Sequence, residues 1–593
     1  MRPWVRAACV VSVAVSSAGA LAASPAPAGL LHDTVERYWQ ESLALDPISA
    51  TFLGDHRYDA ELPVDIGIAH IARHYSLERR YLKILSALEP GSLAPADRLT
   101  YDIFKADRVL AVEGFRYQGE LLPVNQYGGL PQLMAELGSG RSAQPFATTQ
   151  DYENWLRRID RFGPWVDQAI ENMRRGADKG YVQPRVLVER LLPPLDKLIA
   201  ADPAKSLFMQ PVAAFPAGVP ERDRARLRAA YLAAVTTRLN PDYTRLRDYL
   251  RDQYLPRTRV TVGWSELPLG RAWYAYEVRR WTTTQLTPDQ VHETGLAEVR
   301  RLGADLDHLI ADSGFKGGRK AFLDGLRTDP RFYFDKEEDL LAGYADLKAR
   351  VRARLPEQFD LMPKADFEIR AVDAFRAQSR ASAAYEAASP DGARPGVFYV
   401  NTDDLKSRPK YSMQELYLHE AEPGHHFQIS VQQELSGLPS FRRLGNYGAY
   451  VEGWSLYAES LGAPLGLYTD PYDRIGALSD EMWCAVRLVV DTGLHAKGWS
   501  RKQAIDYLLA NAAIGEADAS AAVDRYIAHP GQALTYTIGE LKFKELKARA
   551  ERELGARFDV RAFHHEVLGD GALPLDALDA KVGRWIAAQR AAP

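Results

Sequence analysis

At positions 418–426 the chain reads Leu418-His419-Glu420-Ala421-Glu422-Pro423-Gly424-His425-His426. This run places three histidines and two glutamates within eight residues of a 593-residue chain that has only 13 histidines. Imidazole and carboxylate are the usual ligands of a catalytic zinc, and a glutamate beside the first histidine is the usual general base. The run therefore predicts one bound zinc ion and metal-assisted hydrolysis.

The spacing of the histidines requires a break in the helix. In the HExxH motif the two histidines are four residues apart and share one helical face, whereas His425 follows His419 by six residues. On an unbroken helix such side chains would be about 120° and about 9 Å apart, too far for one zinc ion. Pro423 lacks an N–H and disfavours a helix, and Gly424 permits a sharp turn. We expect a helix over residues 413–422 that ends or kinks at Pro423.

After this break the chain would bring His425 or His426 back toward His419, with Glu420 facing the reacting water. The alternative is a helix that simply ends here, with histidines near its negative end and an ordinary Pro-Gly turn after it.

The third ligand is expected in the segment 450–459, Tyr-Val-Glu-Gly-Trp-Ser-Leu-Tyr-Ala-Glu. Glu452 and Glu459 are seven residues apart and so share a helical face, together with the apolar Leu456. Carboxylates on an apolar face are costly unless they are paired or bind a metal. We assign Glu452 as the ligand and Glu459 as a partner that orients a histidine. The alternative is a pair of solvated carboxylates on an amphipathic helix.

Two groups are candidates for stabilising the oxyanion that forms when water attacks a carbonyl. Tyr536, after the turn signal at 530–531, is the first, and His495 is the second. Arg487, Asp491 and His495 are spaced by four residues on one helical face. Asp491 would then fix the tautomer of His495, and Arg487 would pair with Asp491 or with a substrate carboxylate. The alternative is a purely structural ladder of ion pairs.

With these segments in hand, the chain resembles a bacterial family, domain of unknown function 885, which carries an HExxPGHH motif. The resemblance extends to the segments 46–55, 274–276, 282–284, 489–495 and 530–536. That family is similar in layout to gluzincin zinc metallopeptidases, and Val451-Glu452 is similar to the metal-binding segment of thimet-like oligopeptidases. The resemblance favours Glu452 over Glu459, and His425 over His426, as ligands. The chain departs from true gluzincins by two extra positions between the histidines.

Hydrophobic periodicity predicts a mainly α fold. Helices are expected over residues 35–45, 71–88, 96–112, 149–175, 220–254, 288–313, 336–355, 476–497, 501–513 and 538–552. Strands are expected at 259–262, 367–372 and 397–401, as a small β-sheet near the active centre. The last of these is either a core strand or an edge that pairs with the substrate. We expect one large unit over 30–593, with an N-terminal lobe (about 30–260) and a C-terminal lobe carrying the metal site around a deep cleft.

The chain ends and the composition bear on location and partners. Arg2 and Arg6, the largely apolar stretch 7–15 and Ala20-Leu21-Ala22, which fits a small-residue cleavage site, predict a signal peptide over 1–22. A short flexible segment, 23–29, follows it. We therefore expect export to the periplasm or beyond. With no later run of 18 apolar residues, no membrane association is expected after cleavage. The net charge of −4, without a basic stripe, argues against nucleic acid.

Together these features predict a secreted zinc-dependent peptidase with a peptide as its partner. His419, His425 and Glu452 would hold the metal and Glu420 would be the general base. Two alternatives stay open: a zinc hydrolase of a non-peptide amide or ester, and a non-catalytic peptide-binding protein on the same fold.

Overall fold

The computed structural model describes residues 27–372, 382–390, 392 and 394–591. The predicted signal peptide, 1–22, and most of the predicted flexible segment, 23–29, lie outside the described residues. The described chain is mainly helical with one small sheet, which confirms the predicted fold class. Among the described residues, no helix has the length and apolar character needed to cross a bilayer.

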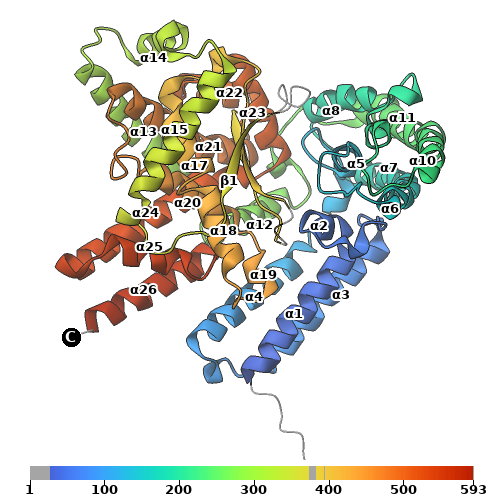
Figure 1. The fold of residues 1–593 in the computed structure, drawn as a ribbon, viewed down its shortest axis with the longest axis horizontal. Coiled ribbons are helices and arrows are strands. Elements are labelled where there is room, and N and C mark those ends of the chain that lie inside the picture. The colour runs from blue at the N-terminus through green and yellow to red at the C-terminus, as the bar shows by residue number, and fades with distance from the viewer. Residues whose placement is uncertain (1–26, 373–381, 391, 393, 592–593) are drawn as a thin grey trace, which may run out of the picture.

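One group of helices in the first half of the chain has its own core, built around Trp155, Trp165 and Tyr243. In Figure 1 this group is teal to green and lies to the right. Its helices are α5 (Leu130–Gly138), α6 (Thr149–Asp160), α7 (Phe162–Lys179), α8 (Arg185–Leu198), α9 (Gln210–Ala213), α10 (Glu221–Ala234) and α11 (Asn240–Tyr249).

The helix predicted over 149–175 is in fact two helices, α6 and α7, with a break at Arg161. Pro164 has no N–H for the carbonyl of Asp160, so the helical hydrogen bonding is interrupted at this point. A Thr148 capping box with Asp151 fixes the start of α6.

The remaining helices form a larger body. They are α1 (Pro27–Leu45), α2 (Pro47–Phe52), α3 (Ile68–Leu85), α4 (Pro95–Gly114), α12 (Gly270–Thr282), α13 (Pro288–Asp312), α14 (Arg319–Thr328), α15 (Glu337–Arg354), α17 (Met413–Glu420), α18 (His425–Glu434), α19 (Ser440–Arg443), α20 (Gly448–Glu459), α21 (Pro471–His495), α22 (Arg501–Asn511), α23 (Glu516–Ala528), α24 (Thr535–Leu554), α25 (Val560–Leu568) and α26 (Leu575–Ala591).

The first long helices belong to this larger body by packing. Leu31 of α1 and Phe104 of α4 are buried in the same core as α17, α20 and α24, and the Phe104 ring lies 5.1 Å from that of Phe441. The division into lobes near residue 260 therefore stays a prediction, because the cores group α1, α3 and α4 with the C-terminal half.

The sheet has three strands, β1 (Phe367–Ala371), β2 (Ala383–Glu386) and β3 (Gly396–Val400), in the order β1-β3-β2. β3 is central, parallel to β1 and antiparallel to β2. Of the two alternatives for the strand predicted at 397–401, the core strand is confirmed and the edge that pairs with the substrate is wrong. The strand with an open edge beside α17 is β2. The strand predicted at 259–262 is also wrong: Arg259 forms only an isolated bridge with Pro184.

A close contact between α20 and α24 sets the geometry around the candidate site. A Cβ added at Gly453 would lie 2.3 Å from the Cα of Gly539, and one at Gly539 would lie 1.9 Å from the carbonyl oxygen of Ala449. Only glycines allow the two helix backbones to approach this closely. The contact holds the N-terminal turn of α24, which carries Tyr536, against the helix that carries Glu452.

Candidate metal centre

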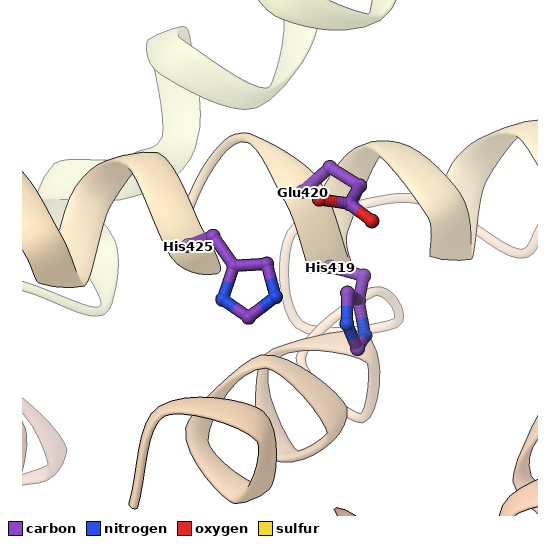
Figure 2. A group of neighbouring side chains, drawn as sticks. All are labelled: His419, Glu420 and His425. Carbon is purple, nitrogen blue, oxygen red and sulfur yellow. The ribbon is translucent and has the colours of Figure 1, made fainter. Parts of the chain in front are cut away.

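The helix break lies where the sequence predicts it. Helix α17 ends at Glu420, and α18 begins at His425. Gly424 is required between them, because a Cβ there would lie 1.9 Å from the carbonyl oxygen of His419 and 2.3 Å from that of Leu418. The chain thus doubles back on the end of α17. Figure 2 shows His419 and Glu420 at the end of one helix and His425 at the start of the next, across this turn.

Neighbouring elements hold the turn in place. Trp454 Nε1 on α20 donates a hydrogen bond to the carbonyl of Pro423 at 2.8 Å. The Glu422 carboxylate is buried, and Arg352 of α15 donates to both of its oxygens, at 2.8 and 2.9 Å. The Tyr417 hydroxyl donates a third bond to it at 3.2 Å. The turn is therefore fixed by long-range contacts as well as by its own sequence.

The candidate ligands converge across this turn. The ligand atoms of His419, Glu420 and His425 all lie within 4.8 Å of one another. Glu452 Oε2 lies 3.7 Å from His419 Nε2 and 3.5 Å from His425 Nε2. Ligands about 2.0–2.1 Å from a tetrahedral zinc would be about 3.3 Å apart, so these distances suit one shared ion.

Two carboxylates thus compete as the third ligand. We favour Glu452, because its Oε2 faces the Nε2 atoms of both histidines. Glu420 Oε2 instead accepts a hydrogen bond from the backbone N–H of Tyr385 at 2.8 Å. That bond holds the Glu420 carboxylate beside the two histidines.

Side chains on one face of α20 contact both histidines. Glu452, Ser455 and Glu459, at positions i, i+3 and i+7, point the same way. Glu459 Oε1 lies 2.8 Å from His419 Nδ1, and Ser455 Oγ lies 2.8 Å from His425 Nδ1. With both Nδ1 atoms engaged, both Nε2 atoms are left to face Glu452, which is the arrangement that zinc-binding histidines usually have.

The charges of the site reinforce this arrangement. Burial by itself lowers the pKa of His419, but the neighbouring carboxylates of Glu452 and Glu459 outweigh it and raise that pKa well above its ordinary value. Burial raises the pKa of Glu452, and the two histidines more than reverse this, so that it lies well below the usual range. Glu459 has a raised pKa, chiefly because it is buried. The cluster attracts a cation strongly.

His426, the alternative second ligand, points elsewhere. It is fully buried, and its Nδ1 lies 3.0 Å from the Tyr385 hydroxyl and 3.3 Å from Ser430 Oγ. Burial lowers its pKa to about 4. His426 therefore packs behind the turn and supports Tyr385, the residue whose amide holds Glu420.

A pocket of about 370 Å³ adjoins this part of the site. Residues of β2, including Tyr385, line one side, and Phe52 of α2 and Glu136 of α5 line another. Since the Tyr385 amide binds Glu420, the pocket and the candidate centre share one edge strand.

Tyr536 lies beside the histidines. Its ring is nearly parallel to that of His419, with 6.4 Å between centroids. The guanidinium carbon of Arg487 lies 4.4 Å from the Tyr536 ring centroid. Burial raises the pKa of the Tyr536 hydroxyl, and the charge of Glu452 adds to the rise, so the hydroxyl stays protonated as a donor.

The predicted series Arg487, Asp491 and His495 does not form a network. Asp491 accepts hydrogen bonds from the Tyr274 hydroxyl at 2.6 Å and from the Gly531 amide at 3.0 Å. The prediction that Asp491 orients His495 or pairs with Arg487 is therefore wrong. Common spacing puts these side chains on one face of α21, but Asp491 and His495 form hydrogen bonds to groups on other segments.

His495 has no free ring nitrogen. Its Nδ1 accepts from the Trp264 amide at 3.2 Å, and its Nε2 lies 3.0 Å from the carbonyl oxygen of Tyr526, to which it donates. The side chain is fully buried, and burial lowers its pKa to about 3. His495 is thus a structural residue that joins three segments, and the prediction that it stabilises an oxyanion is wrong.

Three residues of the site escaped the sequence interpretation: Tyr385, Ser455 and Arg352. Ser455 had a readable signal, because it shares the helical face of Glu452 and Glu459. Tyr385 lies on a four-residue strand, and Arg352 on a helix 70 positions before Glu422. Nothing local marks either residue.

Comparisons with known proteins identify the family and the fold. Residues 47–582 match the family described as "Bacterial protein of unknown function (DUF885)", and the chain belongs to it. No curated protein matches the chain.

Solved structures share the fold. The "putative lipoprotein from Colwellia psychrerythraea" is 26% identical, covering 95% of this chain and 100% of that one, with a TM-score of 0.88. A "putative lipoprotein of unknown function from Shewanella oneidensis" is 17% identical over 93% and 99%, with a TM-score of 0.73. A Pyrococcus furiosus carboxypeptidase gives 11% identity over 95% and 99%, but its TM-score of 0.37 is too low to bear on function.

Proposed function

We propose that this protein is a zinc-dependent peptidase of the gluzincin type. One observation carries the proposal: Glu452 Oε2 faces the Nε2 atoms of His419 and His425 at 3.7 and 3.5 Å, while both Nδ1 atoms are held by α20. Two imidazoles whose Nδ1 atoms are already held and one carboxylate form the donor set of a catalytic zinc, and the ion would take the place of the proton that His419 holds. The residues present therefore fit one zinc ion.

His419, His425 and Glu452 would hold the ion. When bound, zinc would act as a Lewis acid that polarises the substrate carbonyl and lowers the pKa of the attacking water. The side chains of these residues are 13%, 13% and 22% exposed, so the centre is sheltered but open to a ligand.

Glu420 acts as the general base. Its carboxylate, held by the Tyr385 amide, takes a proton from the attacking water and passes it to the leaving amine nitrogen. The bond from the carbonyl carbon to the water oxygen forms first and leaves negative charge on the carbonyl oxygen. The carbon–nitrogen bond then breaks as the nitrogen takes the proton from Glu420, giving a carboxylic acid and an amine. Tyr536, whose hydroxyl stays protonated, donates to the oxygen on which negative charge develops.

The test combines metal content with turnover. Protein purified without chelators should contain about one zinc per chain, as expected for a site with three protein ligands. His419→Ala, His425→Ala and Glu452→Ala should each lose the zinc, whereas His426→Asn should keep it. Glu420→Gln should retain zinc but hydrolyse a peptide library at a small fraction of the wild-type rate.

Two results would contradict the proposal. The first is wild-type protein that takes up no zinc even after incubation with the ion. The second is a Glu420→Gln variant with wild-type turnover, which would remove the general base from the mechanism.

We also infer that the chain is exported to the periplasm or beyond. The predicted signal peptide supports this, as does the description of the Colwellia protein as a "putative lipoprotein". N-terminal sequencing of the protein recovered from a periplasmic fraction should begin near residue 23. An uncleaved protein confined to the cytoplasm would contradict export.

A further inference from the structure

Arg487 carries a guanidinium that no carboxylate contacts, although the charges of Glu452 and Asp480 act on it at longer range. Within the described ranges, no carboxylate lies within ion-pair distance of it, and its Nε is buried without a hydrogen-bond acceptor. A buried charge without a partner is costly, so such a group in a folded protein calls for an explanation. Most other partly buried arginines of this chain are paired, as Arg352 is with Glu422.

Aromatic rings hold this guanidinium in one place. It lies 5.0 Å from the Trp483 ring and 4.4 Å from the Tyr536 ring. The planar guanidinium of an arginine carries its N–H donors in the fork geometry that matches a carboxylate. Arg487 is therefore positioned by packing, and its buried Nε has no acceptor among the described residues.

The Tyr536 ring also connects Arg487 to the candidate metal centre. Tyr536 lies between Arg487 and His419, since its ring contacts the guanidinium on α21 and lies parallel to the imidazole at 6.4 Å. Arg525 is a second guanidinium near Tyr536, and both arginines oppose the rise in the pKa of its hydroxyl. An anionic group bound at Arg487 would thus lie next to the residue that faces the scissile bond.

We propose that Arg487 binds the C-terminal carboxylate of the substrate, so that the enzyme cuts peptides a short, fixed distance from a free C-terminus. This inference rests on the proposed peptidase function and narrows its substrate class. A structural role for Arg487, such as balancing the charge of Glu452 at longer range, would affect all substrates alike. If Arg487 instead binds the substrate carboxylate, its loss should slow the hydrolysis only of substrates that have a free carboxylate.

The experiment compares two N-acetylated peptide libraries of identical sequences, one with free C-terminal carboxylates and one with C-terminal amides. Wild-type protein should hydrolyse the free acids at least about 30-fold faster in kcat/KM, the low end of what loss of a buried charge pair costs. Mass spectrometry should place the cuts at one fixed distance from the C-terminus.

Substitutions of Arg487 test whether this residue causes the preference for free C-terminal carboxylates. Arg487→Met should lose about 30-fold on the acids and change little on the amides. Arg487→Lys should recover part of the loss, because it keeps the charge without the fork. Arg474→Met, on an exposed arginine of the same helix, is the control and should change neither library. Zinc content should equal the wild-type value in all three variants.

Equal rates on the two libraries, or an equal loss on both in Arg487→Met, would overturn the inference. A binding experiment separates this failure from that of the proposed function. In the Glu420→Gln background, calorimetry should show that the free acid of one library peptide binds more tightly than its amide, and that Arg487→Met removes the difference. That result supports the carboxylate site even if no peptide is hydrolysed, and no difference in affinity refutes it.

Discussion

Glu459 Oε1 lies 2.8 Å from His419 Nδ1, seven residues along α20 from the candidate ligand Glu452. The same helix thus supplies a ligand and the group that orients another ligand. Glu459 is buried, so its bond to His419 is little screened by solvent. The carboxylate fixes the tautomer of His419 and makes its Nε2 more basic.

Replacing Glu459 should weaken zinc binding without abolishing it. In Glu459→Ala, His419 keeps its Nε2 but loses the partner of its Nδ1, and we expect zinc affinity to fall about 10–100-fold. Competition with a fluorescent chelator measures this. Glu551→Ala, on an exposed glutamate of α24, is the control and should bind zinc as the wild type does. An unchanged affinity in Glu459→Ala would show that the hydrogen bond has no part in metal binding.

Gly424 should tolerate no side chain. A Cβ there would meet the carbonyl oxygen of His419 at 1.9 Å, and neither backbone segment can yield without moving a candidate ligand. We expect Gly424→Ala to lower the free energy of unfolding by about 3 kcal/mol and to lose zinc. Urea unfolding and metal analysis measure the two effects.

Gly437→Ala is the matched control, because a Cβ at that exposed position meets nothing within 4 Å. Similar unfolding curves for the two variants would mean that the turn at Gly424 adapts to a methyl group, which would contradict the rigid turn described above.

Much of the fold was predictable because the apolar pattern of a helix is contained in its own stretch of sequence. The 3.6-residue pattern places α13, α15 and α24 close to their observed ends. β2 was missed because a four-residue edge strand, Ala-Ala-Tyr-Glu, with one buried residue is too short to show an apolar pattern. Val260-Thr261-Val262 has strand composition, yet it pairs with no neighbouring strand, and pairing is a tertiary property that composition does not contain.

The residues of the candidate site also divide into those that a local sequence pattern predicts and those that it does not. His419, Glu420 and His425 were predictable because a short run and a helix breaker determine their geometry. Glu452 and Glu459 followed from the period of one helix. The contacts of Arg352 and Tyr385 join residues 70 and 35 positions apart, which no local pattern encodes. His495 was misassigned because spacing gives the face of a helix but not the backbone groups that meet it.

The ion pair between Arg352 and Glu422 should stabilise the turn. Glu422 is buried, so Arg352→Met would leave its carboxylate without a counter-charge. Because Arg352 is itself 36% exposed, solvent screens part of the effect, and we expect a loss of about 2 kcal/mol in the free energy of unfolding. Adding Glu422→Gln should restore about half of this loss, since the unpaired charge is then removed.

Arg350→Met is the control for that pair. Arg350 lies on the same helix and pairs with the exposed Asp346, so its loss should change stability by less than about 0.5 kcal/mol. If Arg350→Met and Arg352→Met cost the same, the buried position of Glu422 would have no energetic consequence, and the turn would be held by its backbone contacts alone.

His495 should make stability depend on pH. Its Nδ1 accepts from Trp264 and its Nε2 donates to Tyr526, so a proton added at Nδ1 would oppose the Trp264 amide. Burial lowers the folded-state pKa from 6.5 to about 3. As the pH falls below 6.5, the unfolded chain binds a proton that the folded chain does not, so stability declines until the pH reaches about 3.

Urea unfolding of the wild type and His495→Gln across this range measures the effect. The variant should be less stable at pH 7.5, because at least one of the two backbone groups loses its partner. Its stability should fall less steeply on acidification, so the two curves should converge as the pH drops, and carboxylates common to both proteins cancel in the difference. Parallel curves would mean that His495 binds a proton equally in both states, which its two backbone hydrogen bonds do not allow.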